Sequence, residues 1–185
     1  MNSSLAYQEE PREELLNGKI FMMSSPSVNH NRIIAHIFNS FFNYLKGKTC
    51  ESFCDGVDVY LTEQDRVIPD IMIICQKDII KKNGIYGTPD LIVEVLSPST
   101  AKNDRGYKKE LYESLGVKEY WIVDPVSQNI EVYLLTAGKY RLDEIYQLPE
   151  EDMTEKEKNL CKTVVPISLF ENFSIPLEEI FYNLI

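Results

Sequence analysis

The segments VIPDIMII (residues 67–74) and PDLIVEVLSPS (residues 89–99) decide the fold of this chain. Each is a short apolar run next to a Pro-Asp pair, which is the pattern of a buried strand entered through a turn. Each also places one acid on its core-facing side, Asp70 in the first segment and Glu94 in the second. A buried carboxylate is costly unless it is paired or holds a metal ion. The two acids therefore mark a candidate site.

Helices and strands are predicted on both sides of these two segments. The first expected elements are a strand at 18–23, a helix from about 29 to 46 ended by Gly47, and strands at 51–61, 67–75 and 90–96. They are followed by a helix at 103–115, a strand at 118–124, a hairpin formed by NIEVYLL and KYRLDEIY, and a C-terminal helix at 174–185. This order predicts a mixed α/β (α+β) fold with a mixed central sheet flanked by helices.

The helix at 29–46 has one broad apolar face. At about 100° per residue, that face contains Ile33, Ile34, Ile37, Phe38, Phe41, Phe42 and Leu45. His30 falls on the same face, in the first turn. A histidine in this position is more often a hydrogen-bonded core residue, but it can also form the wall of a site and contact substrate or a carboxylate. Both interpretations of His30 stay open.

Two Pro-Asp pairs occur, so the partner of Glu94 has to be chosen between Asp70 and Asp90. Asp90 and Glu94 face the same way on one strand, but four residues at ~3.3 Å each separate them by ~13 Å, too far for one cation. Asp70 lies on the adjacent strand, where cross-strand neighbours approach within roughly 5 Å. Asp70 and Glu94 are therefore the expected pair. They suit Mg²⁺, which prefers oxygen ligands, and the backbone carbonyl of Val95 can add another.

Helix phase selects the lysine that accompanies these acids. In the helix predicted at 103–115, the buried arc is defined by Tyr107, Leu111, Tyr112 and Leu115. Asp104 and Lys108 lie within this arc, and the stem of Lys108 can run along the apolar face and bring its ammonium to the carboxylates. Arg105 and Lys109 lie toward the edge of the arc. They are candidates for contacts with substrate phosphates.

A structural alternative accounts for part of this pattern. Asp104, Lys108 and one strand acid can form a buried salt-bridge cluster with no further role. That cluster explains a single acid well, but it leaves the second strand carboxylate without a partner. Two acids and one lysine on core-facing positions are instead the set that metal-assisted phosphodiester hydrolysis requires.

Length and composition narrow the class of protein. The 185 residues suit one compact domain, which we expect to span residues 1–185. No apolar run reaches the ~20 residues of a membrane span, and the N-terminus lacks the order of a signal peptide, so we expect a soluble, cytoplasmic protein with no membrane partner. The four cysteines form no CxxC pair, which disfavours zinc and predicts reduced thiols at Cys50, Cys54, Cys75 and Cys161.

The distribution of charge limits the mode of nucleic-acid binding. A net charge of −10 argues against a sequence-indifferent nucleic-acid coat, which depends on Lys and Arg. Much of the excess acid lies in two stretches, Glu9 to Glu14 and an expected mobile loop at about 149–160. The region from Lys102 to Lys109 is locally basic and is where a polyanion is expected to approach. Tyr86, Tyr107 and Tyr120 are candidates to stack on bases, although packing is the commoner use of tyrosine.

The combined motifs resemble one known family. They are IPDIMII (68–74), PDLIVEVLSPST (89–100), D-x-x-x-K-x-x-x-Y over Asp104, Lys108 and Tyr112, and GVKEYWIVDP (116–125), and together they look like the Uma2 family of proposed restriction endonucleases. The likeness extends to ELLNGKIFMMSSPS with His30 and to VVPISLFENFSIPLEEIF. It covers nearly the whole chain, with the acidic stretch at 150–160 as its least typical part.

The resemblance implies the restriction-endonuclease-like PD-(D/E)xK fold and a divalent metal, usually magnesium. By position, Asp70 is the acid of the Pro-Asp element and Glu94 is the second acid. The chain departs from the parent pattern because Leu96 stands where the lysine is expected. The superfamily tolerates a lysine moved to the following helix, and Lys108 fits that substitution. Glu14 matches a family position, as an extra site acid or as part of the entry hairpin.

The expected function is a Mg²⁺-dependent endonuclease, with Mn²⁺ as a possible substitute. Asp70 and Glu94 would hold the ion, Lys108 would orient water or neutralise charge, and three further groups would form the wall or fix the first ligands, namely His30, Glu14 and Asp104. Nucleic acid, with DNA preferred, is the expected partner, and a homodimer is the default for cutting both strands of a duplex. The alternatives are an inactive nuclease-fold module that binds protein or nucleic acid, and a centre acting on a small phosphorylated metabolite.

Overall fold

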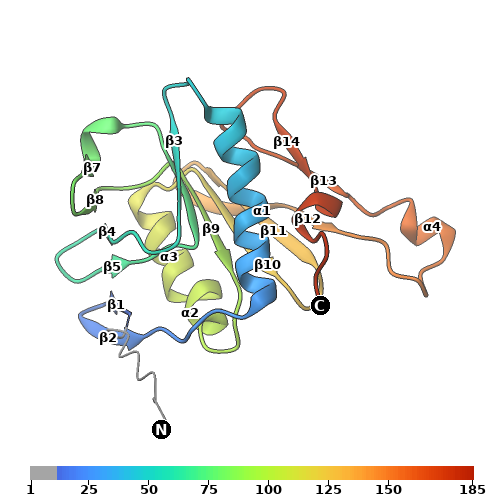
Figure 1. Cartoon of the computed structure of the whole chain (residues 1–185), viewed down its shortest axis with the longest axis horizontal. Coiled ribbons are helices and arrows are strands. Elements are labelled where there is room, and N and C mark those ends of the chain that lie inside the picture. The colour runs from blue at the N-terminus through green and yellow to red at the C-terminus, as the bar shows by residue number, and fades with distance from the viewer. Residues whose placement is uncertain (1–11) are drawn as a thin grey trace, which may run out of the picture.

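The structure, a computed structural model, describes residues 12–185 and contains two six-stranded sheets and a two-stranded hairpin. The long helix α1 (Val28–Leu45) crosses the middle of the molecule in front of the strands, and α2 (Ala101–Arg105) and α3 (Tyr107–Leu115) lie behind them (Figure 1). The predicted mixed α/β fold is confirmed. Its second large sheet was not foreseen.

The central sheet, sheet B, is mixed. Its strands in spatial order are β12 (Lys139–Gln147), β11 (Asn129–Thr136), β10 (Glu119–Asp124), β9 (Leu91–Val95), β6 (Ile71–Ile74) and β3 (Glu51–Cys54). The pair β9 and β10 is parallel and the other pairs are antiparallel. The predicted strands at 90–96 and 118–124 and the predicted hairpin are all present.

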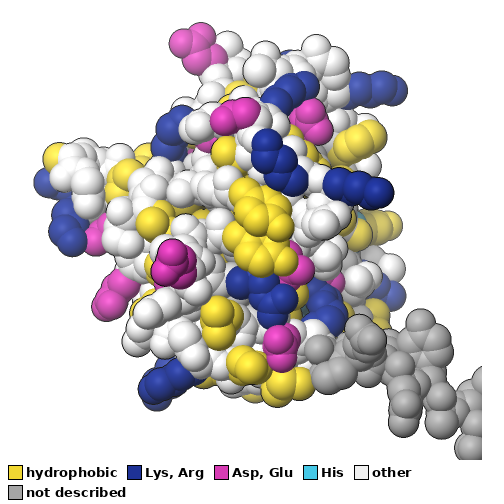
Figure 2. Space-filling view, turned by 90° about the vertical axis from the view of Figure 1, so that its left-hand side faces the viewer, with side chains coloured by type: hydrophobic (Ala, Val, Ile, Leu, Met, Phe, Trp, Pro, Cys, Tyr) yellow, Lys and Arg dark blue, Asp and Glu magenta, His cyan; other side chains and the backbone are white. Residues whose placement is uncertain are grey.

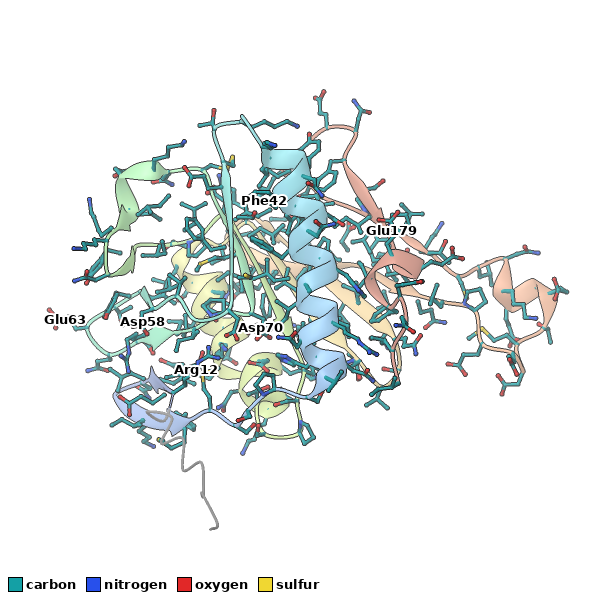
Figure 3. The ribbon with its side chains drawn as sticks, in the orientation of Figure 1. Arg12, Phe42, Asp58, Glu63, Asp70 and Glu179 are labelled. Atoms are coloured by element: carbon teal, nitrogen blue, oxygen red, sulfur yellow. A yellow bond between two sulfur atoms is a disulfide. The ribbon has the colours of Figure 1, made fainter. Side chains whose placement is uncertain are left out.

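Alternating residues of sheet B bury its two faces against different helices. Ile71 and Ile73 pack in the cluster that includes the apolar face of α1, whereas Met72 and Ile74 pack in the cluster that includes Leu111 of α3. The helix predicted at 29–46 is confirmed, and each of its ends differs from the prediction by one residue. Phe42, expected on its buried face, is instead 51% exposed near one end of α1 (Figure 3).

The other six-stranded sheet, sheet A, closes the core on the side of α3. Its order is β2 (Lys19–Met22), β1 (Glu13–Leu16), β5 (Arg66–Val67), β4 (Val59–Tyr60), β8 (Gly84–Tyr86) and β7 (Ile80–Lys81). The segment 76–89, between the strands predicted at 67–75 and 90–96, contains two short strands and the 3₁₀ helix η1 (Lys77–Ile79). The inner residues of sheet A pack in the same cluster as α3, namely Leu16, Val59, Val67 and Ile85.

Two predicted strands are wrong in extent because each is divided between the two sheets. The stretch 51–61 contains β3 and β4, separated at Gly56, whose φ of 94° is a left-handed conformation suited to glycine. The stretch 67–75 contains the end of β5 and all of β6, separated at Pro69, which has no N–H for a strand ladder. Hydrophobic pattern alone does not show these changes of sheet.

Three further predictions need correction at element ends. The helix expected at 103–115 is broken at Gly106 into α2 and α3. The C-terminal helix expected at 174–185 is shorter, because 174–176 forms β14 (Ser174–Pro176) against β13 (Val164–Pro166), and only α5 (Leu177–Ile180) is helical. The acidic stretch at 149–160 is not all loop, since it contains α4 (Glu155–Lys158), capped by Thr154.

The cysteine prediction is wrong for two of the four residues. Cys50 and Cys75 form a disulfide, whereas Cys54 and Cys161 are free. The register of β3 and β6 explains the pairing, because Glu51 lies opposite Ile74 and the preceding and following residues are the two cysteines. Strand register is a tertiary property, so spacing in the sequence did not reveal it. Separately, no helix within residues 12–185 combines the length and apolarity that a bilayer crossing needs.

The disulfide predicts the number of reactive thiols. Purified protein that is denatured without reductant should show two free thiols, from Cys54 and Cys161, and four after reduction. Thiol titration with a chromogenic disulfide measures both values. The same titration on Cys50→Ser should give three thiols before reduction, because Cys75 loses its partner, and four thiols in the unreduced wild type would contradict the pairing.

Candidate active site

The register between β6 and β9 brings the two predicted acids together. Ile71 lies opposite Val93 in this antiparallel pair, so continuing the register by one residue places Asp70 opposite Glu94. The Val95 N–H donates to Asp70 Oδ2 at 2.7 Å. Both acids lie on the side of sheet B that faces α3, and Asp70 lies near the centre of the molecule between α1 and sheet A (Figure 3).

Lys108 reaches the same point from α3. Its Nζ lies 2.7 Å from Glu94 Oε1, 3.1 Å from Glu14 Oε1 and 3.3 Å from Asp104 Oδ1. The lysine is only 2% exposed, so these ion pairs are shielded from water. The break at Gly106 does not separate Asp104 from Lys108, and the helix-phase prediction of their common side is correct.

Glu14 comes from the other sheet. It lies on the inner side of β1, where its Oε1 accepts hydrogen bonds from the Ile68 N–H at 2.9 Å and from Lys108. Glu14 therefore joins the segment before Asp70 to α3. Glu14 lies both beside Lys108 and in the hairpin of β1 and β2, so its role as an additional site acid stays a prediction.

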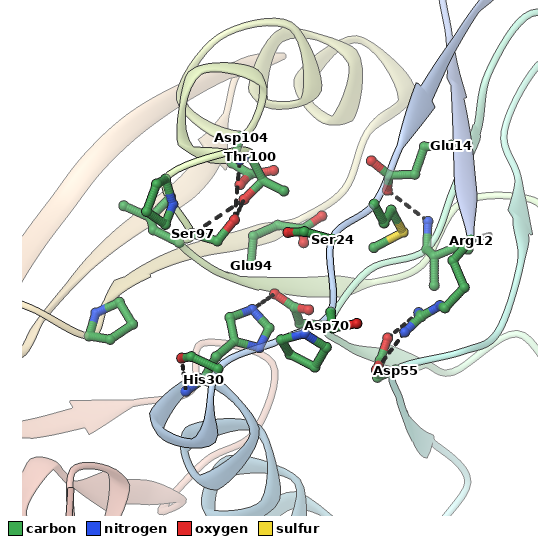
Figure 4. Close-up of a pocket in the computed structure, with 18 of the residues that line it drawn as sticks. Arg12, Glu14, Ser24, His30, Asp55, Asp70, Glu94, Ser97, Thr100 and Asp104 are labelled. Atoms are coloured by element: carbon green, nitrogen blue, oxygen red, sulfur yellow. Dashed lines mark hydrogen bonds and ion pairs between the residues drawn. The ribbon is translucent and has the colours of Figure 1, made fainter. Parts of the chain in front are cut away.

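His30 contacts the site from the first turn of α1. Its Nε2 lies 2.9 Å from the Val95 carbonyl oxygen and 3.4 Å from Asp70 Oδ2 (Figure 4). Burial lowers the pKa of His30, but the hydrogen bond and the charge of Asp70 outweigh it, so its pKa is raised overall. The hydrogen bond to a backbone carbonyl fits the first interpretation of His30 and the contact with a carboxylate fits the second, so the role of His30 in a site stays a prediction. The Val95 carbonyl, predicted as a metal ligand, lies beside this imidazole.

The charges in the cluster are unequal. Four buried carboxylates belong to the cluster, those of Glu14, Asp70, Glu94 and Asp104. Three of them are within ion-pair distance of the Lys108 ammonium, and Asp70 lies beside His30. Burial raises the pKa of Glu94 well above its usual range, with Lys108 opposing and the neighbouring acids adding to the rise. Burial lowers the pKa of Lys108, but Glu94, Tyr112 and the other acids outweigh it, so the ammonium remains charged. This excess of acid is a condition that a bound cation would relieve.

A cavity of about 240 Å³ opens onto the cluster. Its lining includes Arg12, Glu14, His30, Asp70, Glu94 and Lys108 (Figure 4). Loops 23–27 and 96–100 form part of its wall, and they meet where Ser24 Oγ lies 3.1 Å from Ser99 Oγ. The acids are therefore at the base of a hollow rather than sealed in the core.

The structural alternative accounts for many of these contacts but not for the cavity. Lys108 pairs with Asp104, as that alternative requires, and Asp70 finds a partner in His30. However, Asp70 uses only Oδ2 and Glu94 only Oε1 in hydrogen bonds and ion pairs within residues 12–185. Each carboxylate thus keeps a second oxygen at a cavity wall, which a purely structural ion pair does not need.

These oxygens suit a hard divalent cation. In the described part of the chain, no three His, Cys, Asp or Glu side chains converge as a ready-made metal cluster. Mg²⁺ commonly takes one or two protein carboxylates and completes its shell with water and substrate phosphate. The free oxygens of Asp70 and Glu94 and the excess of acid fit such a sparse site.

Two predicted phosphate contacts are not at the cavity. Arg105 pairs with Glu131 and lies 3.9 Å from Asp124, and Lys109 lies 3.5 Å from the centre of the Tyr133 ring. Neither residue lines the hollow. A contact with a longer substrate outside the hollow stays a prediction for both.

The three tyrosines considered for stacking differ in exposure. Tyr120 is fully buried, and Tyr107 donates to Asp65 Oδ1 at 2.8 Å. Tyr86 is 48% exposed and stacks on Tyr60 at 4.5 Å between ring centres. Tyr86 belongs to β8 and Tyr60 to β4. These strands lie on the face shown in Figure 2, where hydrophobic side chains lie among those of Lys and Arg. Burial therefore excludes Tyr120 from stacking on a base, and Tyr86 is the most exposed of the three.

Sequence reasoning missed several residues of the site. Tyr112 donates from its hydroxyl to Glu94 Oε1 at 2.8 Å, and the spacing Asp104, Lys108, Tyr112, one helical turn each, was the available signal. Arg12 pairs with Asp55 at the cavity wall. No local pattern pointed to that pair, because its members are far apart in the sequence.

Comparisons with known proteins agree with this architecture. The family model described as "Uma2: Putative restriction endonuclease" matches residues 3–160. Two uncharacterized proteins of Synechocystis sp. are similar: slr1290 is 33% identical over 70% of this chain and 70% of its own length, and sll1609 is 26% identical over 68% and 73%. A crystal structure described as a putative nuclease belonging to DUF820 from Anabaena variabilis superposes with a TM-score of 0.71, covering 94% of this chain and 91% of that one at 20% identity. The fold prediction is thereby confirmed.

The charge balance predicts the effect of removing the lysine. Lys108→Met should destabilise the metal-free protein by about 3–5 kcal/mol, since it leaves buried carboxylates without their cation. The folded variant should hold protons on acids that are ionised above about pH 4 when unfolded, so the loss should shrink as the pH falls. Urea denaturation in EDTA at pH 8 and pH 5.5 measures both effects.

The neighbouring lysine provides the control for this substitution. Lys109→Met removes an equal charge from the surface of α3 and forfeits a contact with Tyr133, worth about 0.5–1 kcal/mol. A loss in Lys108→Met no larger than in this control, or one that grows toward acid pH, would contradict the proposed balance of charge.

Proposed function

The chain belongs to the Uma2 family, and from that premise we propose that it is a Mg²⁺-dependent endonuclease that hydrolyses phosphodiester bonds of nucleic acid, with DNA as the expected substrate. One observation carries the proposal. Asp70, the residue just before β6, lies opposite Glu94 of β9 at a cavity wall, with the ammonium of Lys108 2.7 Å from Glu94.

The ion would be held by the chain's own oxygen atoms. Asp70 and Glu94 would contribute their free carboxylate oxygens, and the Val95 carbonyl would contribute a third ligand. A bound divalent cation supplies Lewis-acid activation of water and neutralises charge on the phosphate, and Mn²⁺ can take the same role. The cavity would admit the scissile phosphate to these ligands.

Lys108 would serve the reacting phosphate. Its raised pKa keeps the ammonium charged across the working pH range, so it can stabilise the negative charge that develops in the transition state or orient the attacking water. In the parent pattern the lysine stands two residues beyond the second acid, where this chain has Leu96. Lys108, on the helix that follows Glu94, would replace that lysine.

Three neighbours would support these groups. His30 would hold Asp70 and the Val95 carbonyl, whereas Glu14 and Asp104 would hold Lys108 from two sides. Residues that orient metal ligands commonly affect metal affinity and activity without touching the metal. A homodimer would supply two such sites for cutting both strands of a duplex.

The two acids predict the outcome of conservative substitution. Asp70→Asn and Glu94→Gln should each lower Mg²⁺-dependent cleavage by about 10³-fold or more, because metal catalysis supplies several kcal/mol of transition-state stabilisation. The assay is a panel of labelled single- and double-stranded DNA and RNA with Mg²⁺ or Mn²⁺. Calorimetric titration of the same variants with the metal should show a parallel loss of binding.

The second Pro-Asp pair provides the matched control. Asp90→Asn changes a buried acid that pairs with Lys118, outside the cavity, so its folded fraction should cleave at the wild-type rate. Full activity in Asp70→Asn or Glu94→Gln would refute the assignment. A wild type that neither binds metal nor cuts any polynucleotide would indicate the non-catalytic module, and metal binding without cleavage would indicate a smaller phosphorylated substrate.

A further inference from the structure

We propose that Tyr112 is a positioning residue, which turns one oxygen of Glu94 toward the cavity and so prepares it to bind a divalent cation; this inference rests on the proposed function. The Tyr112 hydroxyl donates to Glu94 Oε1 at 2.8 Å. The same oxygen lies 2.7 Å from Lys108 Nζ. Both donors therefore act on a single oxygen of the carboxylate.

Holding Oε1 in this way determines where the other carboxylate oxygen of Glu94, Oε2, points. The terminal torsion of a glutamate side chain is broad, so a carboxylate without directed partners can rotate and present either oxygen. Here two donors from consecutive turns of α3 hold Oε1. Within residues 12–185, Oε2 accepts no hydrogen bond, and Glu94 belongs to the cavity lining. The orientation thus leaves one oxygen for a ligand.

The orientation of the Glu94 carboxylate and the compensation of its charge come from different residues. The Lys108 ammonium is shared among Glu94, Glu14 and Asp104, and an ammonium is a compact charge with rotatable donors. The Tyr112 hydroxyl has a single proton to give, and lysine cannot accept it, so that proton points to Glu94. Lys108 compensates the charge of Glu94, and Tyr112 sets its rotation.

The ring of Tyr112 is itself held in place. It is fully buried and packs edge-on against Tyr120, at 5.2 Å between ring centres and an interplanar angle of 71°. The Tyr120 hydroxyl is occupied elsewhere, because it donates to the Asp104 carbonyl oxygen at 3.0 Å. Tyr112 therefore cannot swing away from Glu94 without disturbing the packing between α3 and β10.

The test removes only the hydroxyl. Tyr112→Phe keeps the ring and adds no charged group to the site, and Mg²⁺ and Mn²⁺ binding by the full chain is measured by calorimetric titration. We expect the affinity to fall by about 10- to 100-fold, as for other residues that orient metal ligands. The thermal midpoint in EDTA, measured separately, shows whether the variant is folded at the titration temperature.

Tyr120→Phe is the matched control. It also loses a buried hydroxyl and its hydrogen bond, but that bond goes to a backbone carbonyl, so metal affinity should stay at the wild-type value. Unchanged affinity in Tyr112→Phe overturns the positioning role while leaving the proposed function intact, and equal weakening in both variants overturns it as well. Absence of metal binding in the wild type is the distinct result that removes the proposed function, and the positioning role with it.

Discussion

The cost of placing carboxylates out of water governs this structure. Glu14, Glu94 and Asp104 are each at most 4% exposed, and a protein interior disfavours the ionised form of a carboxyl group. One ammonium, that of Lys108, lies within ion-pair distance of all three. The cluster is compensated only while β1, β9, α2 and α3 hold their relative positions, so the site and the fold depend on each other.

This dependence explains the presence of sheet A. In sheet B alone, Glu94 and Asp70 would meet Lys108 and His30 from the helices, but the side of the cluster at Glu14 would be open. The hairpin of β1 and β2 closes that side, and Glu14 secures it by accepting from the Ile68 N–H just before the Pro-Asp pair. The inner residues of sheet A then bury the apolar surface around α3. A second sheet thus converts an exposed edge into the wall of a cavity.

The same cluster has more negative than positive charge, and this inequality connects stability to function. A structural ion-pair network gains most when charges are matched and every oxygen has a donor. Here the acids outnumber the ammonium, the pKa values of Glu94 and Asp104 are raised mainly by burial, and the second carboxylate oxygens of Asp70 and Glu94 are among those at the cavity that have no protein donor within residues 12–185. Such an arrangement is incomplete as a core and suited to a cation, which is the basis of the proposed nuclease activity.

Local sequence determined the parts of this protein that follow from periodicity and residue type: α1, β9, β10, the hairpin of β11 and β12, and the common side on which Asp70, Glu94 and Lys108 meet. These succeed because strand alternation and helix phase depend only on neighbours along the chain. Tertiary structure alone decided the change of sheet at Gly56 and Pro69, the Cys50–Cys75 pairing, and the contact of Glu14 with Lys108. Register and the packing of distant segments set these features, and no short stretch of sequence contains that information.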